Sequence, residues 1–216
     1  MHRKALNAFF LLPALLFLAA CGWLAFAVPQ GETELWINRR ATALTDYFFL
    51  YTTEGGHGLF YAAVVAMLLF VHIGYAAALT FAGLLVSLVS NTMKHAVYVD
   101  APRPPRFFEG IDLHHVEGSE ILYHNSFPSG HTMTAFALFF LLSQLGKRKA
   151  WGLLFALAAV AVGMSRVYLL KHFFLDVCIG GAIGLVIGLF VHFVVMPAAK
   201  KWNFKLTLRG IRRVDA

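Results

Sequence analysis

Residues 150–197 read AWGLLFALAAVAVGMSRVYLLKHFFLDVCIGGAIGLVIGLFVHFVVMP, two long apolar runs on either side of a short polar segment. Each run reaches the length of about 17–25 residues that an α-helix needs to cross a bilayer. The polar segment between them carries Arg166, His172 and Asp176. Ionisable side chains at the edge of a membrane span are costly and usually serve a function. The stretch therefore predicts two membrane helices with a functional site where they meet the membrane boundary.

The rest of the chain has the same character. Of its 216 residues 59% are hydrophobic and only 13% are charged, whereas a soluble domain carries roughly a quarter of its residues as Asp, Glu, Lys and Arg. The runs lack the strict alternation of barrel strands, so the spans must be helices. We predict an all-α, six-helix transmembrane bundle that forms a single integral-membrane domain over residues 1–216. The predicted spans lie near 6–28, 56–73, 75–93, 131–145, 150–168 and 173–197.

The distribution of basic residues predicts the orientation. Six spans put both termini and the 146–149 connection on one side, and most lysines and arginines gather there. The positive-inside rule makes that side cytoplasmic. We therefore expect cytoplasmic termini and a periplasmic site in a bacterial inner membrane. The residues that carry this prediction are Arg3, Lys4, Lys147, Arg148, Lys149, Lys200, Lys201, Lys205, Arg209, Arg212 and Arg213.

The net charge of +7 follows from this topology, so it requires no nucleic acid as a partner. The basic C-terminal tail is interleaved with Trp202, Phe204 and Leu206, which favours an anchor on anionic lipids. A solvated terminus that only satisfies the topology is the alternative. No pattern in the sequence indicates an obligatory protein partner.

Cys21 and Cys178 both lie inside predicted spans, so we expect neither a disulfide nor a thiol metal site.

Two polar segments separate the early spans. Residues 29–55 roughly follow a helical period and are expected to form one amphipathic interfacial helix, ended by Gly55-Gly56. Residues 94–130 are rich in proline and are expected to be a loop. The histidines of that loop match no standard metal-ligand spacing.

On the last span, four glycines provide a small-residue face that we expect to pack within the chain: Gly180, Gly181, Gly184 and Gly188.

His172 and Asp176 are separated by four residues and so share one face of a helix. A carboxylate in that position can hold one imidazole N–H and leave the other nitrogen free as a nucleophile. Arg166 precedes them and offers a fork of donors that matches phosphate oxygens. The alternative is an interfacial arginine and histidine beside a helix capped by aspartate. The combination of all three residues favours phosphate chemistry.

Pro128-Ser129-Gly130-His131 leads directly into the fourth span. Gly130 allows close approach of the backbone to a ligand, and the N–H groups of a helix start favour an anion. His131 is a second imidazole, placed to protonate a leaving oxygen. Alone, the tetrapeptide would be a turn with Ser129 as the helix cap. Beside the other motifs it indicates a phosphate site.

Lys94 and Arg103-Pro104 form the third group, at the end of the third span. Two further cations can neutralise phosphate oxygens as charge builds in a transition state. The alternative is that both residues only mark the membrane boundary. No Walker loop, HExxH or CxxC pair is present in the sequence. Because three cations are available to neutralise the phosphate, we expect no metal and no cofactor.

These motifs resemble the type-2 phosphatidic acid phosphatase superfamily, whose pattern is Lys-x6-Arg-Pro, Pro-Ser-Gly-His and Ser-Arg-x5-His-x3-Asp. The second and third motifs stand here unchanged, and the resemblance covers nearly the whole chain. The first motif departs from the pattern because eight residues separate Lys94 from Arg103. This longer spacing puts the role of Lys94 in doubt, although Asp100-Ala101-Pro102 is turn-prone and can absorb the insertion.

The resemblance implies a phosphohistidine at His172, an orienting role for Asp176 and a general acid at His131. It also implies a phosphate-binding set made of Lys94, Arg103, Ser129, Gly130 and Arg166. The implied substrate is a membrane lipid phosphate or diphosphate, with undecaprenyl diphosphate first and lipid A 1-phosphate or phosphatidylglycerol phosphate next. A phosphotransferase that passes the phosphoryl group to an acceptor such as lipid A is the alternative. A vanadate haloperoxidase and a non-catalytic lipid carrier are more distant ones.

Overall fold

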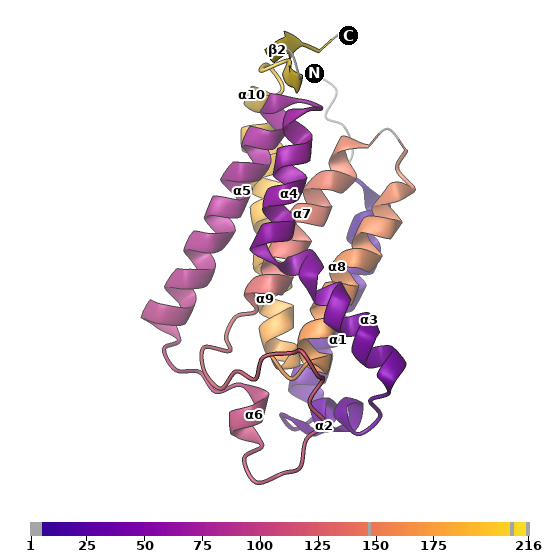
Figure 1. Cartoon of the computed structure of the whole chain (residues 1–216), viewed down its shortest axis with the longest axis vertical. Coiled ribbons are helices and arrows are strands. Elements are labelled where there is room, and N and C mark those ends of the chain that lie inside the picture. Colours follow the sequence, from indigo (N-terminus) through magenta and orange to yellow (C-terminus); the bar gives the residue numbers. More distant parts are fainter. Residues whose placement is uncertain (1–5, 147, 208–209, 215–216) are drawn as a thin grey trace.

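The computed structural model describes residues 6–146, 148–207 and 210–214 and is mostly helical (Figure 1). Arg3, Lys4, Lys147 and Arg209, which entered the predicted charge asymmetry, lie outside the described residues. The predicted all-α membrane fold is confirmed. Its longer helices are α1 (Ala8–Ala27), α4 (Gly58–Leu69), α5 (Ile73–Thr92), α7 (Gly130–Leu145), α8 (Trp151–Tyr168) and α9 (Phe174–Phe190).

Four segments of the described chain are long and apolar enough to cross a membrane. They are α1, Ile73–Val97, α8 and Phe174–Ala199. The second and fourth continue their helices through wider π-type turns, η2 (Met93–Val97) and η3 (Val191–Val195), and the fourth ends with α10 (Met196–Ala199). The apolar helices α4 and α7 are shorter. Length alone therefore supports four of the six predicted spans.

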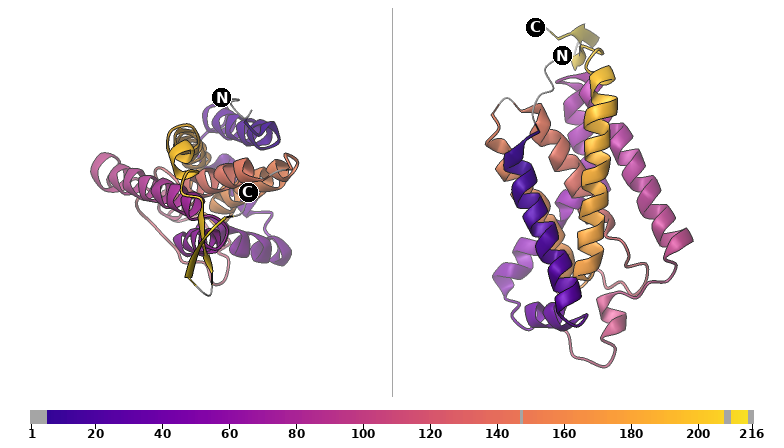
Figure 2. Two further views of the ribbon diagram at one scale, coloured as in Figure 1. Left: turned by 90° about the horizontal axis from the view of Figure 1, so that it is seen from above. Right: turned by 180° about the vertical axis from the view of Figure 1, so that it is seen from behind.

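Helix α7 forms the centre of the bundle. Its side chains are buried along most of its length, and it packs against α5, α8 and α9. The view from above in Figure 2 shows the other helices arranged around it. Because its neighbours cover it, its apolar residues form the hydrophobic core, with Met133, Phe136 and Phe140 fully buried.

The glycines of α9 allow its backbone to lie directly against α7. A Cβ atom added at Gly180 would lie 2.5 Å from the Ser129 carbonyl oxygen, and one at Gly184 would lie 2.2 Å from the Met133 carbonyl oxygen. Only residues without a side chain fit at such contacts. The small-residue face thus packs within the chain, as predicted, and it fixes the starts of α7 and α9 side by side.

The prediction of one helix over residues 29–55 was wrong in detail. The segment forms α2 (Glu32–Asn38), α3 (Ala43–Thr52) and the 3₁₀ turn η1 (Thr53–Gly56). The break occurs because Thr42 adopts an extended conformation and caps α3, with a reciprocal pair of hydrogen bonds between Thr42 and Thr45. Helix α3 exposes an apolar face, as expected of an interfacial helix, made of Leu44, Tyr47, Phe48 and Tyr51.

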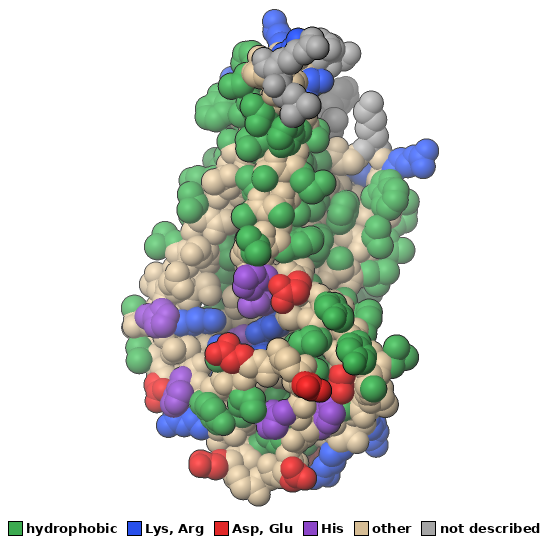
Figure 3. Space-filling model, viewed as in Figure 1, with side chains coloured by type: hydrophobic (Ala, Val, Ile, Leu, Met, Phe, Trp, Pro, Cys, Tyr) green, Lys and Arg blue, Asp and Glu red, His purple; other side chains and the backbone are tan. Residues whose placement is uncertain are grey.

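The two ends of the bundle differ in character. At one end, called the tail end, α10 is followed by an antiparallel hairpin of β1 (Phe204–Thr207) and β2 (Gly210–Arg213) (Figure 1). At the other, the loop end, lie α2, α6 (Pro104–Phe107) and the irregular segment 98–129. Figure 3 shows the acidic and histidine side chains gathered over the half that includes the loop end, with a hollow at their upper margin. All three predicted motifs lie toward that half.

Candidate active site

His172 lies at the centre of the site, in the turn between α8 and α9. It is only 1% exposed. Its Nδ1 atom is 3.4 Å from Oδ2 of Asp176, which also accepts a hydrogen bond from the Phe173 backbone N–H. Asp176 thus holds one side of the imidazole while it caps the first turn of α9. The predicted pairing of these two residues is present in the structure.

The opposite nitrogen of His172, Nε2, faces Arg103 at 3.5 Å from Nη1. Burial lowers the pKa of His172 well below its usual value, and the positive charges of Arg103, Arg166 and Lys94 lower it further. The imidazole is therefore neutral at physiological pH. A neutral ring that donates through Nδ1 has its lone pair on Nε2, so Nε2 is the ring atom that could attack an electrophile.

Arg103 is held rigidly by backbone carbonyl groups. Its Nε donates to the His124 oxygen at 2.6 Å, Nη1 to the Lys171 oxygen at 2.8 Å and Nη2 to the Asn125 oxygen at 3.0 Å. These carbonyls come from segments far apart in the sequence, so the guanidinium ties the 98–129 loop to the α8–α9 turn. A cation fixed in this way can stabilise a developing negative charge without reorganising.

Arg166 has a polar atom free for a ligand. It is buried at the end of α8, where Nη1 donates to Oγ1 of Thr53 at 2.5 Å. Its Nε atom is also buried, and among the described residues it has no hydrogen-bond partner. Buried donors are nearly always satisfied in native structures, so an open one calls for an explanation. A phosphate oxygen is the acceptor that a guanidinium fork fits best.

The second motif lies at the start of α7, against the start of α9. The Ser129 backbone N–H donates to the Asp176 carbonyl at 3.0 Å, and the Ser129 hydroxyl shares a hydrogen bond of 2.8 Å with the Thr132 hydroxyl. In this structure the Ser129 side chain therefore acts as a helix cap. Its role as a phosphate ligand stays a prediction, together with that of Gly130.

Lys94 reaches the site in spite of the longer first motif. A Cβ atom added at Gly130 would lie 3.7 Å from Nζ of Lys94, which places the ammonium group beside the second motif. The chain accommodates the extra residues through the wide turn η2 and a turn at Asp100, whose φ is 64°. The structure thus brings all three motifs together.

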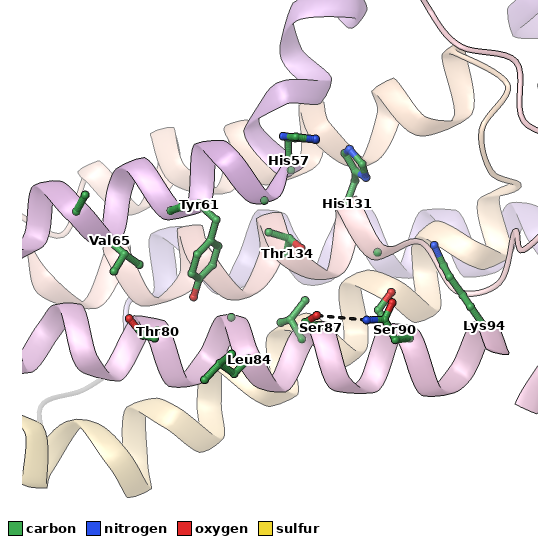
Figure 4. Close-up of a pocket in the computed structure, with 18 of the residues that line it drawn as sticks. His57, Tyr61, Val65, Thr80, Leu84, Ser87, Ser90, Lys94, His131 and Thr134 are labelled. Carbon is green, nitrogen blue, oxygen red and sulfur yellow. Dashed lines mark hydrogen bonds between the residues drawn. The ribbon is translucent and has the colours of Figure 1, made fainter. Parts of the chain in front are cut away.

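A groove leads from the site along the side of the bundle. It has a volume of about 690 Å³ and runs between α4 and α5 with α7 behind it (Figure 4). Tyr61, Val65 and Leu84 are among the residues that line its apolar length, and His57, Lys94 and His131 stand at its polar end. His172 does not line it, whereas Lys94 of the first motif and His131 of the second do. Its shape and composition fit an apolar chain that carries a phosphate at one end.

Several residues that complete the site were not predicted from the sequence. The Ser126 hydroxyl donates to Oδ2 of Asp176 and lies 3.5 Å from Nδ1 of His172. Thr53 holds Arg166, and the ring of His57 lies 5.9 Å from that of His131. Their partners are distant in the sequence, so spacing could not reveal these contacts. Lys171 is a further buried cation, and burial lowers its pKa to about 8.

The comparison with known protein families agrees with this geometry. The sequence model of the PAP2 superfamily matches residues 71–200, which include all three motifs. The chain belongs to the PAP2 superfamily. Among solved structures, this PAP2 chain is similar to LpxE from Aquifex aeolicus, with a TM-score of 0.67 and 27% identity over 76% of this chain and 94% of that one. It also shares the fold of a PAP2-type phosphatidylglycerolphosphate phosphatase from Bacillus subtilis, with a TM-score of 0.59 and 23% identity over 87% and 94% of the two chains.

Curated relatives match over shorter stretches. The bacitracin transport permease protein BcrC of Bacillus licheniformis is 42% identical over 67 residues, 31% of this chain and 32% of that protein. A lipid A 1-phosphatase of Porphyromonas gingivalis is 36% identical over 93 residues, 38% of this chain and 20% of that protein. The matches thus span about a third and a fifth of these relatives' lengths.

Proposed function

We propose that this PAP2 protein hydrolyses a phosphate or diphosphate head group from a membrane lipid through a phosphohistidine at His172. One observation carries the proposal: Nε2 of a buried, neutral His172 faces Arg103, and the buried Nε–H of Arg166 has no acceptor among the described residues. A phosphoryl group placed there would meet a nucleophile and two guanidinium groups at once. Family membership and the similarity to LpxE support the same chemistry.

In the first step, His172 Nε2 forms a bond to phosphorus and the bond from phosphorus to the leaving oxygen breaks. His131 gives its proton to that oxygen. Asp176, fixed by Ser126 and the Phe173 N–H, stabilises the charge that the His172 ring acquires. In the second step water attacks the phosphorus, His131 takes a proton from that water, and phosphate leaves His172.

We propose that Lys94, Arg103 and Arg166 supply the positive charge that a divalent cation supplies in many phosphoryl transfers. Arg103 is preorganised by three carbonyl contacts, so its charge costs little to position. Ser129 and Gly130 complete the phosphate-binding set through the backbone at the start of α7. The reaction would therefore proceed without a metal.

The groove favours a lipid as the substrate. Its apolar walls between α4 and α5 accept a hydrocarbon chain, while the head group reaches the motifs past His131. We propose undecaprenyl diphosphate as the first candidate substrate, with lipid A 1-phosphate and phosphatidylglycerol phosphate as the next candidates. The names of the lipid A 1-phosphatase and of the phosphatidylglycerolphosphate phosphatase among the similar proteins support a lipid of this class.

We further propose a bacterial inner-membrane location with both termini in the cytoplasm and the site in the periplasm. The motifs lie toward the loop end, while Lys200, Lys201 and the basic hairpin lie at the tail end. The positive-inside rule assigns the tail end to the cytoplasm. The hairpin residues Lys205, Arg212 and Arg213 would there contact anionic lipids.

The test is phosphate release by the detergent-purified protein in the presence of EDTA. Each lipid named above is supplied in turn, with His172→Ala as the inactive variant and His115→Ala, an exposed loop histidine, as the matched control. We expect release that survives EDTA and the control substitution and disappears in His172→Ala. Release at the wild-type rate by His172→Ala would refute the mechanism. Transfer of label to an added acceptor lipid, with little free phosphate, would show a phosphotransferase instead.

A further inference from the structure

His57 stands at the point where the apolar groove meets the catalytic pocket. It precedes α4 and lines the groove together with His131 and Lys94 (Figure 4). The three side chains come from the starts of α4 and α7 and from η2, which continues α5. His57 belongs to none of the three motifs, and the proposed hydrolysis of a phosphate does not use it.

The turn η1, which precedes His57 directly, packs against the site. Thr53, at the start of η1, accepts a hydrogen bond from Arg166. Gly56, at its end, lies so close to the start of α7 that an added Cβ atom would meet the His131 carbonyl oxygen at 2.7 Å. Because Gly56 has no side chain, η1 packs against the backbone of His131 and brings the next residue, His57, beside it. The two rings lie 5.9 Å apart, centre to centre.

The ring of His57 is oriented by a local contact. Its Nδ1 accepts a hydrogen bond from the Leu59 backbone N–H at 3.3 Å, which caps α4. A ring nitrogen that accepts carries no proton, so the proton of the neutral ring is on Nε2. His57 therefore offers the polar end of the groove a hydrogen-bond donor.

A lipid diphosphate would reach that donor. His172 attacks the terminal phosphorus, and His131 donates a proton to the bridging oxygen that leaves. The second phosphate stays with the lipid, whose chain would occupy the groove, so it would lie at the polar end that His57, Lys94 and His131 line. A lipid monophosphate has only an alcohol carbon in that place and leaves the donor without an anionic partner.

We infer that His57 binds the retained phosphate of a lipid diphosphate and so makes the enzyme prefer diphosphates over monophosphates. The inference rests on the proposed function and narrows its substrate class. Lys94, on the opposite wall of the same end, faces the same phosphate. A donor that bonds only to the diphosphate raises its kcat/KM relative to that of the monophosphate.

The experiment compares farnesyl diphosphate with farnesyl phosphate, which differ by one phosphate. Initial rates of phosphate release give the ratio of their kcat/KM values for the wild type and three variants. His57→Asn keeps a side chain that can cap α4 but removes the distal donor. His57→Gln places an amide N–H near the position of Nε2. His115→Asn is the matched control on an exposed loop histidine.

We expect the diphosphate-to-monophosphate ratio to fall at least about tenfold in His57→Asn, the loss typical of a hydrogen bond to a charged group. His57→Gln should recover most of it, and His115→Asn should match the wild type. An unchanged ratio in His57→Asn, with both substrates hydrolysed, would overturn the inference and leave the proposed function standing. If the wild type hydrolysed neither these compounds nor the natural lipids, the proposed function itself would fail.

Discussion

Ser126 offers a sharp test of how His172 is held, because its hydroxyl contacts both Asp176 and Nδ1 of His172 and belongs to none of the three motifs. Oδ2 of Asp176 lies within bonding range of three donors: the Ser126 hydroxyl, the Phe173 N–H at 3.0 Å and Nδ1 of His172 at 3.4 Å. Ser126→Ala removes the first. Asp176 then keeps only the Phe173 N–H besides His172, so its carboxylate holds the imidazole ring less firmly.

The size of the effect follows from the kind of bond. A hydrogen bond to a charged group contributes about 1.5–3 kcal/mol, which corresponds to a factor of about 10–100 in rate if it is fully expressed in the transition state. Ser126 is buried behind Asp176 and does not line the groove, so substrate binding should change little. We therefore expect kcat to fall about 10- to 100-fold, with KM within about threefold of the wild type.

The assay is steady-state phosphate release from the preferred lipid, with thermal unfolding measured in parallel. Ser119→Ala, at a half-buried position of the same loop and outside the three motifs, is the matched control. A Ser126→Ala protein that kept its folded state and a kcat within twofold of the wild type would refute the role given to Ser126.

Three further predictions follow. Gly184→Ala should lower the melting temperature by several degrees, because the new Cβ would lie 2.2 Å from the Met133 carbonyl oxygen, whereas Gly58→Ala, in open space, should not. Arg166→Lys should lower kcat/KM about 100-fold, since lysine has neither the fork that binds Thr53 nor the free Nε donor, and wild-type activity would contradict the role of that fork. The pKa of His172 is lowered well below 6.5, so the ring stays unprotonated as the pH falls to about 5.5. We therefore expect kcat/KM to show no loss from this group between pH 7 and 5.5. A loss of kcat/KM that tracks protonation of His172 by NMR would contradict the neutral ring.

The sequence predicted the parts of the molecule that depend on local spacing. The apolar runs gave the helices to within a few residues, because burial or lipid exposure requires an uninterrupted run. The interval between His172 and Asp176 predicted their pairing, but the reason differs from the expected one: His172 lies in the turn before α9, and Asp176 reaches back to it from the first turn of that helix. The glycines of α9 predicted close packing, and Gly180 and Gly184 provide it.

What the sequence did not reveal depends on contacts between distant segments. Ser126 meets Asp176 across 50 positions and Arg166 meets Thr53 across 113, so no local pattern records either pair. The break between α2 and α3 was missed because the Thr42 cap competes with a helical period that continues through it. His57 lies at the groove only because Gly56 lets η1 pack on α7, a contact that appears only in three dimensions.

The central claim is that His172 carries the phosphoryl group, and trapping that intermediate tests it most directly. The purified protein is mixed with a lipid substrate labelled in its terminal phosphate, quenched in alkali within the first turnover and digested for mass spectrometry. The account predicts label on the peptide that contains His172, stable to alkali and lost in acid, and none in His172→Ala. Phosphate release by the wild type with no label on any histidine, or with label on another residue, would contradict it.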